Sequence, residues 1–242
     1  MATSFFTNED LQIPALTTEQ MREVDRIAVE EFDLGILQMM ENAGRNLAQL
    51  ALTYLENDPG RVTILAGPGG NGGGGICCAR HLHNRGVDIS LGLSKSVESL
   101  GGAAKNQFSI VEKSGIQPLA EDEFESAVSQ STLVIDALIG YSLRGAPRGR
   151  AAELIDLCNR LARYVISLDV PSGLDSTTGD TPGLAIRADA TLTLALPKTG
   201  LAHFEGDLYL GDIGIPPEVY KRLGMELETY FKNKYWIPID RR

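Results

Sequence analysis

The residues that decide the fold are Arg61-Val-Thr-Ile-Leu-Ala-Gly-Pro-Gly-Gly-Asn-Gly-Gly-Gly-Gly75. The run from Val62 to Ala66 is apolar and rich in β-branched residues, which is typical of a buried strand. Seven of the next nine residues are glycine, and a helical pattern begins at Ile76. A strand, a glycine turn and a helix together direct backbone N–H groups and the positive end of a helix dipole at an anion. The stretch therefore predicts a ligand-binding loop; the alternative is a flexible turn.

Strands and helices alternate along the rest of the chain. Apolar runs predict further strands at 87–93, 133–139, 164–170, 190–196 and 208–213, the last being the final strand. Helical spacing of apolar residues predicts helices at 18–32, 37–54, 102–114, 124–129 and 151–162. Near-continuous apolar strands separated by helices are typical of a parallel sheet covered on both faces. We therefore expect one α/β domain over residues 1–242, with residues 1–16 as an N-terminal arm.

Composition excludes several classes of protein. A net charge of −10 on 242 residues argues against binding to nucleic acid or to an anionic membrane, because both require a basic face. No apolar run approaches the roughly 18 residues of a membrane span, and residues 1–10 lack the features of a signal peptide. The three cysteines, Cys77, Cys78 and Cys158, form no C-x-x-C pair. We expect them to be reduced, buried thiols in a cytoplasmic protein.

Polar residues interrupt or follow the carboxyl ends of four predicted strands: Asn71, Asp136, Asp169 with Ser172, and Lys198. Ligands bind at this end of the strands in open parallel sheets, so these side chains are expected on one rim. A carboxylate among apolar strand residues, such as Asp136, is costly unless it is hydrogen-bonded or binds a cation. The alternative for each aspartate is a turn-stabilising role, and Lys198 is otherwise a solvated lysine.

The kind of oxygen ligand indicates the kind of cation. Asn71, Asp136 and Ser172 together offer neutral and singly charged oxygens, which suit a weakly held monovalent cation better than zinc. A histidine metal site is not expected, because His81 and His83 are two residues apart on a helix and face different directions. The arginines at 144, 148 and 150 suit a phosphate group, or else they are solvated charges near a helix start.

Five motifs occur in order: Met40-Glu-Asn-Ala-Gly44, the glycine loop at 67–75, Val134-Ile-Asp-Ala-Leu-Ile-Gly140, Leu168-Asp-Val-Pro-Ser-Gly173 and Leu196-Pro-Lys-Thr-Gly-Leu201. Together they resemble the YjeF N-terminal family, the NAD(P)H-hydrate epimerases, over roughly residues 18–220. The resemblance implies a Rossmann-like three-layer α/β/α sandwich with a mostly parallel central sheet, commonly a homodimer. It also implies interconversion of the 6R and 6S hydrates of NADH and NADPH (NADHX and NADPHX), which a partner dehydratase then repairs.

The same resemblance assigns roles to residues. Potassium would be held by Asn71, Asp136 and Ser172. The hydrate would contact Gly70, Asn71, Gly72, Gly73, Gly74, Gly140, Tyr141, Ser142, Leu143, Arg144, Gly145, Ala146 and Asp169. Asp169 is then the candidate acid/base, because inverting the hydrated carbon moves protons. Lys198 either tunes Asp169 or contacts a phosphate. No dehydratase segment follows within the 242 residues, so that partner is expected to be a separate protein.

The glycine loop departs from the family pattern. The family loop usually reads Asn-Asn-Gly-Gly-Asp-Gly, whereas Gly70 and Gly74 stand here at the first Asn and at the Asp. Either that aspartate serves loop order, or this member is impaired, or it is a non-catalytic ligand-binding or scaffold module of the same fold. A nicotinamide-dependent dehydrogenase is the other alternative. It is disfavoured because the second strand ends in Leu93-Ser-Lys-Ser96, without the acidic residue that holds a ribose.

Overall fold

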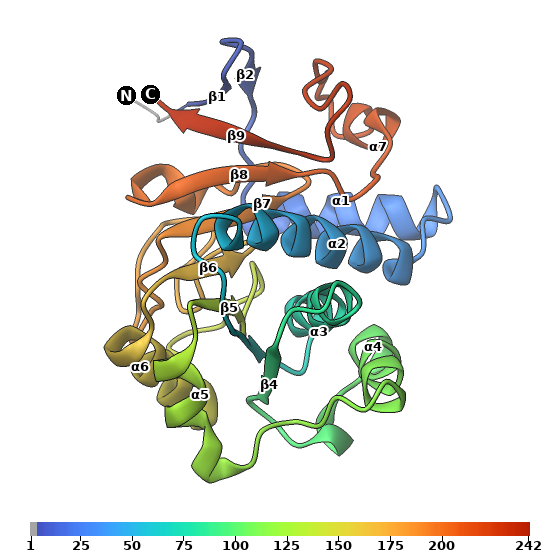
Figure 1. Cartoon of the computed structure of the whole chain (residues 1–242). Helices are drawn as coiled ribbons and strands as arrows, with labels where there is room; N and C mark the ends of the chain where they lie inside the picture. The colour runs from blue at the N-terminus through green and yellow to red at the C-terminus, as the bar shows by residue number, and fades with distance from the viewer. Residues whose placement is uncertain (1–3) are drawn as a thin grey trace.

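The computed structural model of the protein describes residues 4–242 and contains a nine-stranded sheet with helices on both faces (Figure 1). The strand order is β2-β1-β9-β8-β7-β6-β5-β3-β4. Neighbouring strands from β4 to β8 are parallel. Their bounds are Val62–Ala66 for β3, Ile89–Leu93 for β4, Leu133–Ala137 for β5, Val165–Leu168 for β6, Ala190–Leu194 for β7 and Asp207–Gly211 for β8. The predicted α/β class with a mostly parallel sheet is confirmed.

The remaining strands form an antiparallel edge that the sequence did not predict. They are β1 (Phe5–Thr7), β2 (Gln12–Ile13) and β9 (Trp236–Arg241), with β9 between β8 and β1. The prediction that 208–213 is the final strand is therefore wrong, and two short segments of the predicted arm, β1 and β2, belong to the sheet; residues 1–3 lie outside the described residues. These strands are short, and β9 contains Pro238, which lacks the N–H of a regular ladder, so their local pattern is weak.

Seven helices cover the sheet in the part of the chain that the structure describes. They are α1 (Thr18–Glu30), α2 (Ile36–Leu55), α3 (Gly70–His83), α4 (Gly102–Lys113), α5 (Phe124–Gln130), α6 (Arg150–Leu161) and α7 (Pro217–Lys221). The side chain of Thr17 caps α1, and Gln20 completes the capping box, so the local sequence sets where this helix begins. Across residues 4–242, none of the helices is long and apolar enough to cross a membrane.

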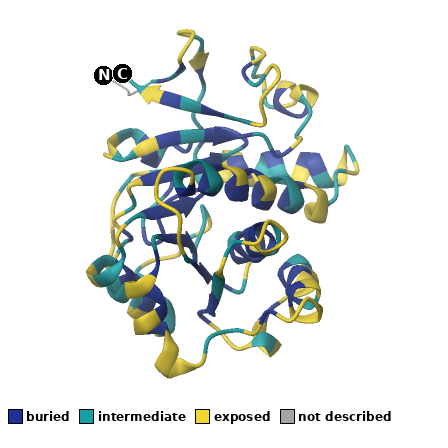
Figure 2. Ribbon diagram, viewed as in Figure 1, coloured by how far each residue is buried: buried dark blue, intermediate teal, exposed yellow. Residues whose placement is uncertain are grey.

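The core lies on both faces of the parallel strands. Along β3, Ile64 and Ala66 pack in one apolar cluster with residues of α2 and α3, whereas Leu65 between them packs in another with residues of α5 and α6. Successive strand residues point to opposite faces, which explains why a doubly covered strand is apolar throughout. Figure 2 shows the consequence, with buried central strands and exposed residues mainly on the outer faces of helices and in loops.

Most of the predicted glycine loop is helical, because α3 begins at Gly70 and its first turns include Gly72–Gly75. A Cβ at Gly73 would lie 2.6 Å from the side chain of Met40, and one at Gly75 would lie 2.5 Å from the Cβ of Ala137. The glycines therefore allow α3 to approach α2 and β5 closely. Tertiary packing has overridden the low helix propensity of glycine, which is the physical reason that the loop prediction was wrong for these residues.

Candidate functional site

A cavity of about 300 Å³ opens at the carboxyl ends of β6 and β7, beside the first turn of α3. Predicted site residues contribute much of its lining: Gly70, Asn71, Gly74, Gly140, Tyr141, Ser142, Asp169 and Lys198. The rim expected from the strand-end rule thus brings together groups from β5, β6, β7 and α3. The start of α3 also presents backbone N–H groups, since the first N–H groups of a helix have no partner inside it.

Other predicted residues lie outside the lining of this cavity. Gly72 and Gly73 are buried in helix packing, and the segment 143–146 follows the lining residues toward the surface. Arg144 and Arg148 are exposed. Arg150 begins α6, where its guanidinium pairs with Glu121 and Glu153. The three arginines therefore do not converge on the cavity.

The sequence did not predict the part of the cavity lining that comes from α1 and α2. The lining residues from these helices are Met21, Asp25, Val29, Ile36, Met39, Met40 and Ala43. One signal was available: Asp25 follows Met21 by four residues, so it lies on the face of α1 that also carries the buried Val24 and Ala28. A carboxylate on the apolar face of an amphipathic helix is as unusual as one inside an apolar strand.

Asp169 and Lys198 form a buried ion pair at this cavity. Their side chains are 5% and 1% exposed, and Lys198 Nζ donates to Asp169 Oδ1 as well as to the Leu194 carbonyl at 2.7 Å. Asp169 also accepts from the backbone N–H groups of Tyr141 at 3.1 Å and Leu194 at 3.4 Å. Its φ of 72° is uncommon for a residue with a side chain, and such backbone strain is concentrated at functional sites.

Tyr141 connects Asp169 to the second carboxylate of the cavity. Its backbone N–H donates to Asp169, and its hydroxyl donates to Asp25 Oδ2 at 2.5 Å. Burial raises the pKa of Tyr141, and the neighbouring charge of Asp25 raises it further, so the phenol remains a donor at neutral pH. The tyrosine therefore holds one carboxylate at each end.

Asp136 lies behind the cavity at the end of β5 and is fully buried. Its Oδ1 accepts from Ser172 Oγ at 2.6 Å and its Oδ2 from Ser167 Oγ at 2.7 Å, while the N–H groups of Leu138 and Ser172 also donate to it. Burial raises the pKa of Asp136, and these hydrogen bonds oppose the rise. The carboxylate thus stabilises the turns after β5 and β6, which was one of the two roles expected from the sequence.

Asn71 differs from Asp136, because the Nδ2 atom of its buried amide has no hydrogen-bond partner among the described residues. The amide lies against Gly140, where a Cβ would be 3.1 Å from Asn71 Oδ1. Buried polar groups in proteins are almost always paired. An unpaired amide at the rim is therefore a candidate ligand-binding group, and either the nitrogen or the oxygen of an amide can face a ligand.

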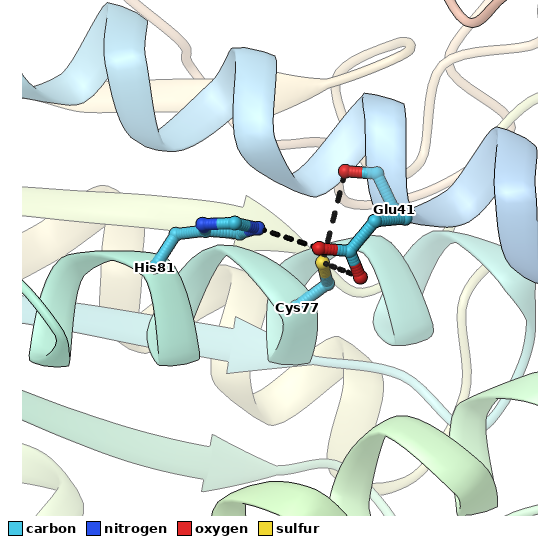
Figure 3. Close-up of side chains that lie close together, drawn as sticks. All are labelled: Glu41, Cys77 and His81. Atoms are coloured by element: carbon cyan, nitrogen blue, oxygen red, sulfur yellow. Dashed lines mark hydrogen bonds and ion pairs between the residues drawn. The ribbon is translucent and has the colours of Figure 1, made fainter.

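A second polar cluster lies between α2 and α3, away from the cavity lining (Figure 3). Glu41 of α2 contacts Cys77 and His81 of α3, with 2.8 Å between His81 Nε2 and Glu41 Oε1. These three side chains could in principle ligate a metal, and the sequence analysis did not bring them together. However, Arg80 Nη2 lies 2.5 Å from Glu41 Oε2 and 3.4 Å from Cys77 Sγ.

The guanidinium of Arg80 already supplies a cation to this cluster. Burial, with the adjacent Glu41 charge, raises the pKa of Cys77 to about 12, so the thiol is neutral rather than a thiolate ligand. Burial alone would raise the pKa of Glu41, but hydrogen bonds from Arg80 and His81 outweigh it and lower the value to about 2. We call this cluster the α2–α3 clamp, because it joins the two helices by charge-assisted hydrogen bonds.

An open, mostly parallel sheet with a cavity at its strand ends and a glycine-rich helix start is typical of α/β proteins that bind a small ligand at this rim. The chain belongs to the family described as YjeF-related protein N-terminus, whose model matches residues 36–200. It is 49% identical over 93% of its length to an NAD(P)H-hydrate epimerase of Dehalogenimonas lykanthroporepellens, covering 92% of that protein. An NAD(P)H-hydrate epimerase of Rhodopirellula baltica is 35% identical over 89% of this chain and 90% of its own.

Two further comparisons concern architecture. A bifunctional NAD(P)H-hydrate repair enzyme Nnr of Moorella thermoacetica is 34% identical over 84% of this chain, which covers only 41% of that longer protein. The crystal structure of yeast ynu0 superposes with a TM-score of 0.81 at 22% identity, covering 93% of this chain and all of that one. At this level of identity the superposition supports the fold alone.

Proposed function

We infer that this chain is an NAD(P)H-hydrate epimerase, which interconverts the 6R and 6S hydrates of NADH and NADPH in nicotinamide cofactor repair. The observation that carries the inference is 49% identity to an epimerase over nearly the whole of both chains. The non-catalytic scaffold alternative rested on the glycines at 70 and 74. It is not favoured, because the cavity retains Asn71, Asp169 and Lys198 around an open space.

We propose that the hydrated ring enters the cavity. A volume of about 300 Å³ lies at the lower end of the roughly 300–1,000 Å³ of ligand sites, so it suits the ring rather than the whole dinucleotide. The remaining nucleotide would lie over Gly70, Ser142 and the segment 143–146, where the surface is open. Asp169 is the proposed acid/base, and Lys198 holds its carboxylate at the ring.

Potassium is the proposed resident cation. Asn71, Asp136 and Ser172 fit a monovalent ion in two respects: the Asn71 amide nitrogen is buried and unpaired among the described residues, and Asp136 supplies a single carboxylate beside the Ser172 hydroxyl. The ion would neutralise that carboxylate and fix the start of α3 beside the ligand. Adding potassium, with sodium as the matched salt, is expected to raise the melting temperature of the wild type but not of Asp136→Ala. A rise equal to that in sodium would contradict the site.

The partners of this activity are also proposals. Relatives of this chain are described as bifunctional NAD(P)H-hydrate repair enzymes, and we propose that a separate NAD(P)H-hydrate dehydratase consumes the epimer produced here. We further propose a cytoplasmic homodimer, without nucleic acid or a membrane as partner. Sedimentation of the purified protein would test the dimer, and a monomer at micromolar concentration would contradict it.

The epimerase itself is tested with purified R and S hydrates. The wild type is expected to interconvert them, and Asp169→Asn to reduce kcat by at least about 100-fold with nearly unchanged KM, because an amide keeps the shape but carries no proton. Asp122→Asn is the matched control, since it makes the same change at an exposed carboxylate. Absence of turnover in the wild type would overturn the proposed function, and full activity in Asp169→Asn would remove that residue from the mechanism.

A further inference from the structure

The cavity contains a carboxylate to which the mechanism above gives no role. Asp25 projects from α1 into the lining together with Met21. Its Oδ2 accepts the hydroxyl of Tyr141 at 2.5 Å. Among residues 4–242, no hydrogen bond to its Oδ1 is found, so that oxygen remains available to a ligand. Asp25 is thus a cavity carboxylate with one oxygen held and the other free.

Asp169 is bound much more completely. Its two oxygens together accept from the N–H groups of Tyr141 and Leu194 and from Lys198 Nζ. Three donors leave little freedom in that carboxylate, whereas Asp25 has a single donor. Two carboxylates in one cavity with such unequal surroundings are the arrangement that allows one to act as an acid while the other acts as a base.

The surroundings of Asp25 favour its neutral form. Burial raises the pKa of Asp25; the Tyr141 hydrogen bond and the positive charge of Lys198 oppose this rise, and the charge of Asp169 adds to it. Tyr220 of α7 also lies close enough for the charge of Asp25 to raise the pKa of its phenol. The titratable groups facing Asp25 are therefore Tyr141, Asp169, Lys198 and Tyr220, and Lys198 is the cation among them.

Inversion of the hydrate requires one proton to be given and one to be taken. When the bond between C6 and its hydroxyl breaks, a proton must reach the departing oxygen, which leaves as water, and the electron pair of the ring nitrogen forms a C=N bond. Water then adds to the opposite face of C6, the electron pair returns to nitrogen, and one proton is released. No oxidant or reductant is needed, but one acid and one base are.

We propose that Asp25 is a second catalytic residue of this site: its acid form gives the proton to the departing C6 oxygen, and Asp169 takes the proton from the incoming water. This rests on the proposed function. In the reverse direction the two carboxylates exchange roles, and exchange with solvent restores their protons between turnovers. Tyr141 joins the pair mechanically, since it holds one carboxylate with its hydroxyl and the other with its backbone N–H.

The first test replaces the acid. Asp25→Asn keeps the size of the side chain, and its amide oxygen can still accept from Tyr141. The amide, however, cannot donate a proton as a carboxylic acid does. We expect kcat to fall by at least about 100-fold, with KM and melting temperature close to those of the wild type. Glu30→Gln is the matched control, because it makes a carboxyl-to-amide change on the exposed side of the same helix, and it should leave the rate unchanged.

The second test uses the pH profile, which a purely structural role would not move. The rate in one direction requires protonated Asp25, so it should fall as pH rises through the pKa of that group. Tyr141→Phe removes a donor that stabilises the charged form, so the falling limb of its remaining activity should shift to higher pH. In Asp25→Asn this limb should disappear.

The outcomes separate the two proposals. An inactive wild type would overturn the epimerase assignment. An active wild type together with an active Asp25→Asn, or a Tyr141→Phe profile whose limb does not move, would overturn the role of Asp25 and leave the assignment intact. If Asp25→Asn melts well below the wild type, Tyr141→Phe decides alone, because it leaves both carboxylates in place.

Discussion

The two ends of α3 perform different tasks with different chemistry. The first turns, Gly70–Gly75, lie beside the cavity and against α2 and β5, and a Cβ at Gly73 or Gly75 would collide with Met40 or Ala137. The second half carries Cys77, Arg80 and His81, whose side chains lock α3 to Glu41 of α2. The first turns of α3 thus line the cavity, whereas its second half is bonded to α2.

The ion pair at the cavity and the ion pair of the α2–α3 clamp differ in burial and in backbone geometry. Lys198 and Asp169 are 1% and 5% exposed and face a cavity, and Asp169 has a positive φ. Arg80 and Glu41 are 17% and 41% exposed and belong to regular helices. The comparison shows that the two ion pairs differ in burial and in backbone geometry, although each joins opposite charges.

The largest effect is expected at the cavity pair. Lys198→Met removes the cation and leaves the Asp169 carboxylate buried without its partner, so the free energy of unfolding should fall by about 3–5 kcal/mol. Urea denaturation would measure it. Lys232→Met is the matched control, because its pair with Glu9 is exposed and should contribute about 0–1 kcal/mol. Equal losses of unfolding free energy in the two variants would contradict the expectation that the buried pair contributes more than the exposed one.

A smaller, pH-dependent effect is expected at the α2–α3 clamp. Because Glu41 is partly exposed, Glu41→Gln should cost only about 1 kcal/mol at pH 7, with the epimerisation rate nearly unchanged. The pKa of Glu41 is lowered to about 2 from its usual value of 4.5. Its stabilisation is therefore fully present above about pH 4.5 and is lost as pH falls toward 2.

Melting curves of the wild type and Glu41→Gln at several pH values would check this window. The gap between them should narrow as the pH falls from 4.5 to 2. A gap that stays constant over this range would show that the carboxylate charge does not stabilise the clamp, and a large loss of activity at neutral pH would place the clamp in the catalytic machinery.

The smallest effects are expected at the two glycines that depart from the family loop. A Cβ at Gly70 meets nothing within 4 Å, and one at Gly74 meets only the Leu168 side chain, at 2.7 Å. Neither glycine has positive φ, so Gly70→Asn and Gly74→Asp should each change the free energy of unfolding by less than about 1 kcal/mol.

The epimerisation rates of these two variants test whether the family loop residues matter in this chain. We expect Gly74→Asp to raise the epimerisation rate, because a carboxylate in the second turn of α3 would order the backbone beside the ligand. Gly70→Asn serves as the matched change one turn earlier in the same helix. An unchanged rate in Gly74→Asp would show that the family carboxylate is dispensable here, and a fall of several degrees in melting temperature would show that Leu168 does not move aside.

Much of the site was predictable from local sequence. The apolar runs of β3, β5, β6 and β7 are long enough to be recognised, and residues at their carboxyl ends must meet at one rim of a parallel sheet. This is why Asn71, Asp169 and Lys198 were expected together and lie around one cavity. Their chemical roles remain proposals, because position at a rim does not by itself assign chemistry.

The other features of the fold and of the cavity depend on contacts between segments that are distant in sequence. Residues 70–75 are helical although glycine disfavours a helix, because Gly73 and Gly75 let α3 pack against α2 and β5 more closely than a Cβ would allow, which is a long-range constraint absent from local propensity. The edge strands β1, β2 and β9 are short and pair the two ends of the chain. Asp25 is remote in sequence from every strand end and reaches the cavity only because α1 packs across it. Local patterns specify elements and their faces, whereas the contacts between distant segments decide which side chains share a site.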